Sequence, residues 1–293
     1  MNILVLGAGG QVGSALLRTR WPAGTQVAGR THAETDVGDA AAIAAVFDAG
    51  SWDVAINAAG HTAVDKAESE PAAALRINGE GPGLLAAECA KRGAVLFHIS
   101  TDYVFDGTKR TPYAESDQPA PLGVYGASKL AGERAVAEKL GRHIILRTSW
   151  VFSATGANFV KTMLRLAAAG RDIRVVKDQI GGPTPAADIA EVLARIVSRL
   201  KAGPIAWGLY HYCGAPAVSW YEFARSIFAI HAKATGKRIP VEPIGTADYP
   251  TPARRPANSR LDCSKILGAF GIEQKPWQEG LESAMKLLEQ QHG

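Results

Sequence analysis

The sequence predicts an α/β protein built on a doubly wound parallel sheet, with a smaller second domain interleaved on its C-terminal side. Short apolar runs alternate with alanine-rich helical stretches through the first half of the chain. That alternation is typical of a parallel sheet covered by helices on both faces. After about residue 150 the alternation stops, and proline and tryptophan become more frequent, which indicates a different architecture there.

Each element of the sheet is expected at a particular range. The strands are expected at 2–7, 25–30, 52–60, 94–100, 143–152 and 208–214. The helices are expected at 11–20, 39–50, 71–93, from Tyr125 to about 140, and at 159–169, 188–200, 219–232 and 277–290. A cofactor-binding domain is therefore expected over 1–150, with elements near 186–212 returning to it, and a mostly substrate-binding domain over 151–293.

Composition excludes several classes of protein. The chain has 293 residues, of which 47% are hydrophobic, so it is neither mainly disordered nor too small for a large core. Its net charge of +4 is too mild for nucleic acid and suits an anionic small molecule. Three widely spaced cysteines, no apolar run of membrane-spanning length and no basic leader at Met1 favour a cytoplasmic protein.

The first chemical motif is the glycine-rich turn "GAGGQVG". Gly7, Gly10 and Gly13 follow the first expected strand directly and open a helix. Glycine permits the tight turn and the close approach of a phosphate, and a helix N-terminus attracts an anion. This context predicts a Rossmann-type dinucleotide site, although the same turn also serves other doubly wound proteins.

The end of the second expected strand selects the dinucleotide. An acidic residue there would bind the ribose hydroxyl of NADH, but the chain has Gly29 and Arg30, with no carboxylate until Glu34. A guanidinium can pair with a 2′-phosphate, so NADPH is expected, with NADH also usable. The alternatives are that Arg30 is an ordinary surface residue, or that Glu34 binds the ribose diol.

Two later strand ends carry small and polar residues. "NAAGHT" follows the third strand, and its small residues leave room for a cofactor; His61 is interpreted as a loop residue near that cofactor. "STDYVFDG" ends the fourth strand, where ligands of open α/β sheets bind. Ser100, Thr101 and Asp102 are therefore placed to contact a substrate, unless they only form a turn.

The most specific motif is "YGASK". Tyr125 and Lys129 lie four residues apart on an expected helix, so they share one face. A neighbouring ammonium would favour the phenolate and make Tyr125 a better acid. The small residues between them leave room for a flat ring. The pair occurs often by chance, but after the glycine turn and the S-T-D strand end it is specific.

In this order the motifs resemble the extended short-chain dehydrogenase/reductase family over nearly the whole chain. Within it the sequence is more closely similar to the family of dTDP-4-dehydrorhamnose reductases. That closer resemblance rests on Trp150 and on "NFVKTMLRLA", "DQIGGPT" and "YPTPARRPANSRLD". It implies that NADPH reduces the C4 keto group of dTDP-4-dehydro-L-rhamnose to give dTDP-L-rhamnose.

The resemblance also implies site residues. The catalytic residues would be Tyr125 as proton donor, Lys129, Thr101 and Asp102. The cofactor would contact Gly7, Gly10, Gln11, Val12, Gly13, Arg30, Asp36, Val37, Ala58, Ala59, Gly60, His61 and Thr62, as well as Tyr125 and Lys129. The substrate would contact Thr101, Asp102, Tyr103, Trp150, Asn158 and Arg260, with the basic loop at 252–260 near its diphosphate.

Two rival functions stay open. One is another nucleotide-sugar epimerase, reductase or dehydratase, although a 4,6-dehydratase would be expected to place an Asp-Glu pair where Asp102 and Tyr103 follow Thr101. The other is a non-catalytic NADP-binding regulatory subunit resembling the methionine adenosyltransferase β-subunit. No metal is assigned, because no carboxylate cluster is evident. A homodimer is compatible with the sequence, and no nucleic-acid or membrane partner is expected.

Overall fold

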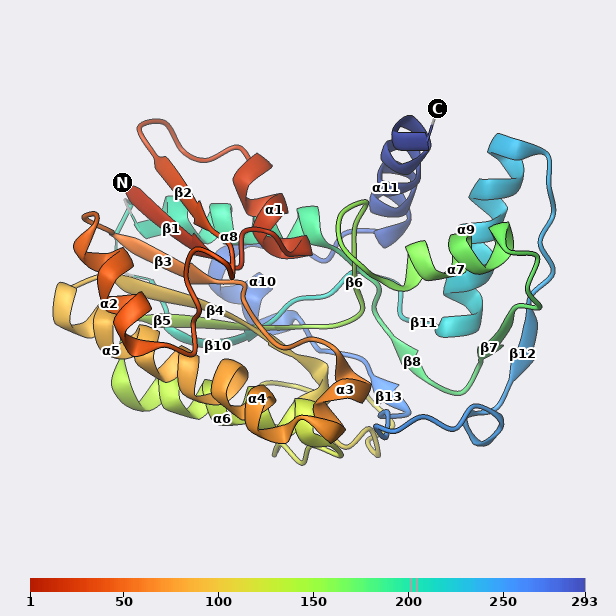
Figure 1. Cartoon of the computed structure of the whole chain (residues 1–293), viewed down its shortest axis with the longest axis horizontal. Helices are drawn as coiled ribbons and strands as arrows, with labels where there is room; N and C mark the ends of the chain where they lie inside the picture. The colour runs from red at the N-terminus through yellow and green to blue at the C-terminus, as the bar shows by residue number, and fades with distance from the viewer. Residues whose placement is uncertain (201, 204, 293) are drawn as a thin grey trace.

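The computed structural model describes residues 1–200, 202–203 and 205–292, and its centre is a six-stranded parallel sheet (Figure 1). The order of the strands is β10-β5-β4-β3-β1-β2. Their bounds are β1 (Asn2–Leu6), β2 (Gln26–Arg30), β3 (Val54–Asn57), β4 (Val95–Thr101), β5 (His143–Thr148) and β10 (Gly208–His211). This parallel, doubly wound architecture confirms the predicted fold class.

Helices cover both faces of the sheet (Figure 1). One face packs on α1 (Gln11–Arg18), α8 (Ala186–Leu200) and α10 (Ser264–Phe270). The other packs on α2 (Ala40–Asp48), α5 (Gly81–Arg92) and α6 (Val124–Lys139), next to α3 (Val64–Ser69) and α4 (Pro71–Leu75). The inner strands β1, β3 and β5 are buried on both faces, which explains their continuous apolar runs, whereas the edge strand β2 is partly exposed.

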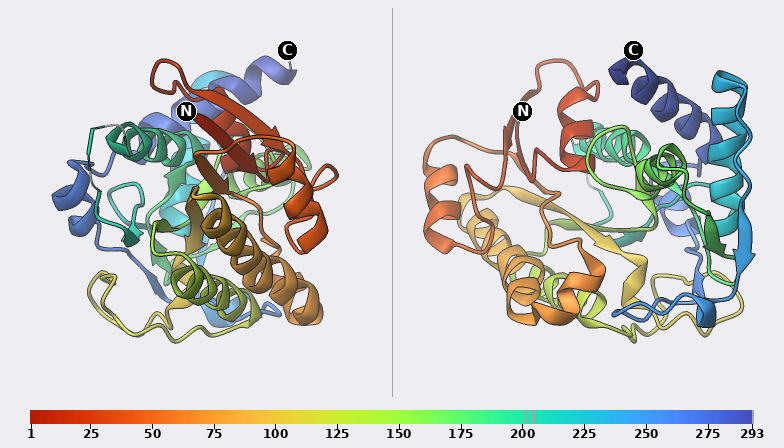
Figure 2. Two further views of the ribbon diagram at one scale, coloured as in Figure 1. Left: turned by 90° about the vertical axis from the view of Figure 1, so that its left-hand side faces the viewer. Right: turned by 45° about the vertical axis from the view of Figure 1, so that its right-hand side comes forward.

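A second part of the molecule lies beyond the carboxyl ends of the strands (Figure 2). It contains α7 (Phe159–Ala168), α9 (Trp220–Thr235) and α11 (Trp277–His292) around a separate aromatic core that includes Phe152, Phe223 and Trp277. The short strands of the chain form small sheets of their own, in the orders β11-β8-β13, β12-β7 and β6-β9. Their bounds are β6 (Val151–Phe152), β7 (Arg174–Val176), β8 (Ile180–Gly181), β9 (Thr184–Pro185), β11 (Val218–Ser219), β12 (Glu242–Ile244) and β13 (Asn258–Ser259).

Two expected elements differ from the structure. The single helix expected over 71–93 consists of α4, a π-helical turn (Arg76–Glu80) and α5. The strand expected over 143–152 is divided into β5 and β6, because Trp150 has a φ of +48° that interrupts the extended backbone. Within the described residues, no helix has the length and apolar character needed to cross a membrane.

Candidate active site

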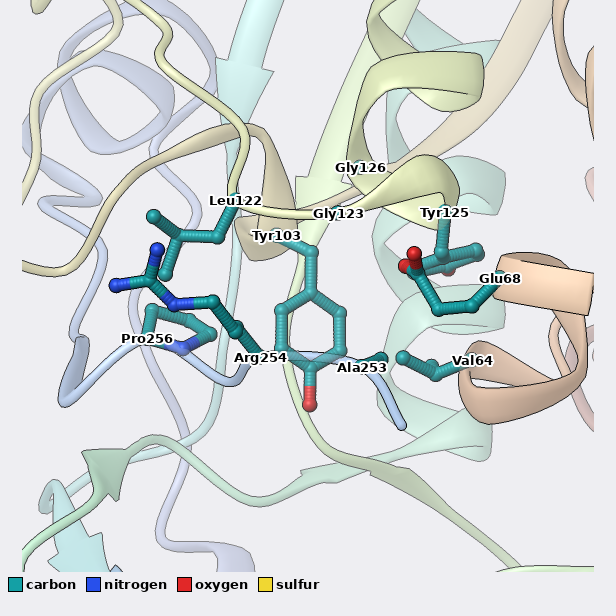
Figure 3. Close-up of a pocket in the computed structure, with 10 residues that line it drawn as sticks. All are labelled: Val64, Glu68, Tyr103, Leu122, Gly123, Tyr125, Gly126, Ala253, Arg254 and Pro256. Atoms are coloured by element: carbon teal, nitrogen blue, oxygen red, sulfur yellow. The ribbon is translucent and has the colours of Figure 1, made fainter. Parts of the chain in front are cut away.

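A small pocket lies where the end of β4 meets the start of α6 (Figure 3). Tyr125 is in the first turn of α6, and Tyr103 follows the end of β4. Figure 3 shows side chains of α3 on one side of the two tyrosines and the loop before β13 on the other. The lining residues are Val64, Glu68, Tyr103, Leu122, Gly123, Tyr125, Gly126, Ala253, Arg254 and Pro256.

Two glycines allow α6 to begin so close to β4. A Cβ on Gly126 would lie 2.1 Å from the Tyr103 carbonyl oxygen, so only glycine permits this approach. Gly123 provides no side-chain cap; instead the Glu68 carboxylate of α3 accepts a hydrogen bond of 2.8 Å from the Val124 amide. The ring of Tyr125 consequently meets that of Tyr103 edge to face, with 5.6 Å between centroids.

Thr101 and Asp102 lie beside Tyr125 as the sequence predicts. The Thr101 hydroxyl donates to Asp102 Oδ1 over 3.1 Å and accepts from the Tyr103 amide over 3.2 Å. Both side chains are buried, and burial raises the pKa of Asp102 to about 6. An ionised Asp102 and a neutral, hydrogen-bonding Asp102 are therefore both accessible near neutral pH.

The expected activation of Tyr125 by Lys129 stays a prediction, and the groups now around the two side chains are as follows. Burial raises the pKa of Tyr125 to about 12, against a lowering effect of a hydrogen bond with Thr101. The charge of Lys129 does not contribute to this change in the pKa of Tyr125. Lys129 Nζ donates to the Ile99 carbonyl oxygen over 2.5 Å and lies 3.5 Å from His98 Nε2. The phenol is therefore a protonated donor at neutral pH.

The glycine turn has the geometry of a dinucleotide cradle. Gly7 has a φ of +78°, and a Cβ there would lie 2.5 Å from the Ala59 amide nitrogen. A Cβ on Gly13 would lie 2.1 Å from the Gly7 carbonyl oxygen, so α1 also packs tightly on the turn. Gly10 is exposed and caps α1 without any side chain. The first amides of α1, at Gln11 and Val12, are thus left for an anion, which fits a pyrophosphate.

Arg30 lies at the end of β2 next to this turn, since its carbonyl oxygen accepts from the Ala8 amide over 3.0 Å. Among the residues that the structure describes, its guanidinium donates a hydrogen bond only to the Gly29 carbonyl oxygen, over 3.0 Å. Glu34, the alternative ribose partner, instead accepts from the amide and hydroxyl of Thr31, both over 2.7 Å. These hydrogen bonds lower the pKa of Glu34.

Asp36 and Val37 lie on the other side of the same loop. The Asp36 carboxylate accepts from Arg76 and from the Gly38 amide, each over 2.9 Å. Val37 is buried, and its carbonyl oxygen would be 2.6 Å from a Cβ on Gly81. Asp36 and Val37 are therefore fixed by the π-helical turn that holds Arg76 and by the start of α5.

The loop after β3 is held by a residue that the sequence analysis did not select. Asn78, buried in the π-helical turn, accepts from the His61 amide over 2.8 Å and donates to the His61 carbonyl oxygen over 3.0 Å and to Ser128 Oγ over 3.1 Å. It ties the loop of Ala58, Ala59, Gly60, His61 and Thr62 to α6. The glycines of "INGEGPG" are the only hint of this turn in the sequence. π-helical turns are frequent at functional sites.

On the sugar side, Trp150 and Asn158 have structural contacts of their own. Trp150 stacks on Trp220 with 3.5 Å between centroids, and it does not line the pocket of Figure 3. Asn158 caps α7 through Lys161 and donates to Gln11 Oε1 over 3.0 Å. Gln11 of the cofactor turn is thus joined to the first helix of the second part.

The basic loop reaches the pocket through a different arginine from the one expected. Arg260 donates to Asn258 Oδ1 over 2.8 Å and to the Arg110 carbonyl oxygen, and it does not line the pocket. Arg254 of the same loop lines it (Figure 3). Between them, Arg255 forms a two-point ion pair with Asp65 of α3, at 2.9 and 2.7 Å.

Metal ligands are not evident in the part of the chain that the structure describes: no group of three or more His, Cys, Asp or Glu side chains is placed to hold an ion.

The site combines Tyr125 and Lys129 of α6, Thr101 and Asp102 at the end of β4, and the glycine cradle before α1. Together with the doubly wound sheet, these features define an oxidoreductase of the short-chain dehydrogenase/reductase class.

Comparison with known proteins identifies the family. The profile of the family described as RmlD substrate binding domain matches residues 1–290. The dTDP-4-dehydrorhamnose reductase of Sinorhizobium fredii is 43% identical, covering 95% of each chain, and that of Aggregatibacter actinomycetemcomitans is 45% identical, covering 96% of this chain and 97% of the relative. The chain belongs to the dTDP-4-dehydrorhamnose reductase family.

A solved structure agrees with this assignment. The dTDP-4-dehydrorhamnose reductase of Bacillus anthracis, crystallised in complex with NADP, is 34% identical and superposes with a TM-score of 0.90. The match covers 98% of this chain and 99% of that one. The resemblance expected from the sequence motifs is thus confirmed.

Proposed function

We propose that this protein reduces the C4 keto group of dTDP-4-dehydro-L-rhamnose with NADPH, giving dTDP-L-rhamnose, and that Tyr125 donates the proton. The reductase activity is that of the family to which the chain belongs. The observation that carries the proposal is the position of Tyr125: it lies partly buried beside Thr101 and lines a pocket at the carboxyl ends of the strands.

The residues of the cradle fit NADPH, which supplies the hydride when it is bound. Gly10, Gln11 and Val12 would hold the pyrophosphate at the N-terminus of α1, and the little-engaged guanidinium of Arg30 would meet the 2′-phosphate. Tyr125 and Lys129 would lie along the nicotinamide ribose. The NADP complex of the relative from B. anthracis supports this choice of cofactor.

Tyr125 and Thr101 have different roles at the keto oxygen: Tyr125 donates the proton and Thr101 stabilises the developing charge. A phenol with a pKa of about 12 keeps its proton at neutral pH, so it is a donor and not a base in the resting protein. The Thr101 hydroxyl is held beside Tyr125 by Asp102 and the Tyr103 amide; by turning its one proton from Asp102 to the keto oxygen it would stabilise the negative charge that develops there. Thr101 is buried and Tyr125 is only partly exposed, which strengthens these interactions relative to those in open water.

We assign the sugar nucleotide to the pocket between α3 and the loop 249–257. Arg254 is the guanidinium that would meet the diphosphate, while Tyr103, Trp150 and Asn158 would surround the sugar more distantly. On this basis residues 1–150, with 186–212, serve the cofactor and the remainder of 151–293 serves the substrate. A cytoplasmic location and a homodimer stay predictions of the sequence.

The decisive experiment follows NADPH absorbance with purified protein and dTDP-4-dehydro-L-rhamnose. Consumption of one NADPH per sugar supports the reductase; binding of NADPH without consumption would favour a regulatory subunit, and conversion of the sugar without net consumption would favour an epimerase.

The change Tyr125→Phe removes the acid and leaves the ring. Turnover is expected to fall by roughly 10²-fold or more, the usual scale of general acid catalysis. NADPH affinity, measured by fluorescence, should stay within about twofold, because the phenol is only one of many cofactor contacts. Near-normal turnover of this variant would remove Tyr125 as the proton donor.

A further inference from the structure

Behind Lys129 lies a buried histidine to which the proposed mechanism gives no role. His98 is on the face of β4 that α6 covers, and none of its surface is exposed. Its Nε2 faces Lys129 Nζ at 3.5 Å, and its Nδ1 lies 3.2 Å from Asn57 Nδ2 on the neighbouring strand β3. The Asn57 side chain is also fully buried.

The contacts of Asn57 decide which nitrogen of His98 carries the proton. The Ala59 amide donates to Asn57 Oδ1 over 3.1 Å, so the oxygen of the side-chain amide must point to Ala59. Asn57 Nδ2 therefore points to His98 and donates to Nδ1, which must use its lone pair. Burial holds the pKa of His98 well below its usual value, so the ring is neutral and its one proton is on Nε2.

This tautomer presents an N–H group to the lysine. An ammonium has no lone pair with which to accept it, whereas a neutral amine has one. The Ile99 carbonyl oxygen accepts an N–H from Lys129 over 2.5 Å and can do so with either form. The contact with His98 therefore favours the amine.

Other charged groups around the pair also act on the pKa values of Lys129 and His98. Burial lowers the pKa of Lys129 to about 8, and Glu133, one turn further along α6, acts to raise it. Glu133 is itself engaged by Arg147 of β5 and Ser100 of β4. The charges that act on His98 are those of Lys129 and of His143 on β5, both in the direction of the neutral ring.

We propose that His98, fixed by Asn57 with its proton on Nε2, is a positioning residue for Lys129 that stabilises the amine relative to the ammonium. Lys129 can then gain and lose a proton close to neutral pH, next to the tyrosine that must be reprotonated in each turnover. The link from this tautomer to turnover rests on the proposed function. The tautomer itself and its effect on Lys129 do not.

The first test uses the unliganded protein and needs neither substrate nor NADPH. Imidazole ¹⁵N NMR of histidine-labelled protein should show His98 with an unprotonated Nδ1 and a protonated Nε2, unchanged from about pH 6 to 9. The signal is assigned with His98→Leu. A protonated Nδ1 in the wild-type protein would overturn the proposal, whatever the enzyme proves to reduce.

The second test reverses the tautomer. In Asn57→Asp the carboxylate accepts from Ala59 and from His98 Nδ1, so Nε2 turns a lone pair to Lys129. The titration of Lys129, followed by ¹³Cε NMR, should move up by about one pH unit or more. The new negative charge also acts directly, and the same change in a His98→Leu background measures that part. The shift should fall to less than half there; an equal shift in both backgrounds would refute the role of His98.

The pH dependence of NADPH binding links this pair to the cofactor. The dissociation constant should change near pH 8 in the wild-type protein, where Lys129 exchanges its proton, and the change should lie at higher pH in Asn57→Asp. If Asn57→Asp does not fold, the ¹⁵N spectrum of the wild-type protein, assigned with His98→Leu, still decides the tautomer.

Discussion

The cofactor side and the sugar side of the pocket are held together by contacts of very different range along the chain. The glycine turn is positioned mostly by one strand–turn–helix unit, by the end of β2 and by the loop after β3, and its Gln11 also accepts a hydrogen bond from Asn158. The sugar side depends on the ion pair between Asp65 and Arg255, which are 190 residues apart in the sequence. A contiguous motif specifies the first side, whereas only the complete fold specifies the second.

This difference explains where prediction from the sequence succeeded. All six strands of the sheet were predicted, because each buried strand reads as an apolar run of its own. Tyr125, Thr101 and the glycine turn are brought to the ends of those strands, as their spacing predicts. The short strands, such as β8 and β13, were not predicted, since two-residue pairings between distant segments leave no local pattern.

The same limit applies to single residues. Arg254 and Arg260 belong to one basic loop and cannot be told apart by composition; only the folded loop shows which one lines the pocket. His98 and Asn57 read as ordinary members of buried strands, because their contact joins β3 to β4 across 41 residues. The π-helical turn that carries Asn78 also reads as plain helix.

On the cofactor side, reversing the charge of Arg30 should have the largest effect, which is on the preference for NADPH over NADH in kcat/KM. A charge-assisted hydrogen bond to a 2′-phosphate contributes roughly 1.5–3 kcal/mol, or about ten- to a hundredfold in affinity. NADPH should exceed NADH by about that factor in kcat/KM, and Arg30→Asp should abolish or reverse the preference because it also adds repulsion. The KM for the sugar nucleotide should stay unchanged.

Arg30→Gln is the matched control, since it removes the charge without adding repulsion and should only weaken the preference. Equal use of both cofactors by the wild-type protein would return Arg30 to the surface residues. Glu34, which Thr31 now holds, would then be the group to test for binding of the ribose diol.

Within the basic loop, Arg254→Ala should have the next largest effect. Arg254 lines the pocket, with its exposed guanidinium near Leu122 and Pro256 (Figure 3), so its loss should raise the KM for the sugar nucleotide by about tenfold, the scale of one charge-assisted contact, and leave NADPH affinity unchanged. Arg260→Ala is the control from the same loop, because Arg260 is engaged with Asn258 and Arg110. Steady-state kinetics in which Arg260→Ala raises KM more than Arg254→Ala would contradict this assignment.

The smallest effect is expected from releasing the loop without removing any group from the pocket. Arg255 pairs with Asp65 at two points and also donates to Thr251 Oγ1 and to the Ala253 carbonyl oxygen, so it both shapes the loop and ties it to α3. The pair is partly exposed, with 22% and 43% of the Arg255 and Asp65 side chains accessible, so its net contribution to stability is modest.

Arg255→Met should therefore raise the KM for the sugar nucleotide by about three- to fivefold. It should leave kcat and NADPH affinity nearly unchanged, because Tyr125 and the cradle are positioned independently. Asp65→Asn, which keeps the shape but removes the charge, should have a smaller effect because Arg255 keeps its bonds to Thr251 and Ala253, and the double variant should be no worse than Arg255→Met, since both changes break the ion pair. Effects that add, or a loss of NADPH affinity, would show that the two sides of the pocket are not separable in the way their contacts indicate.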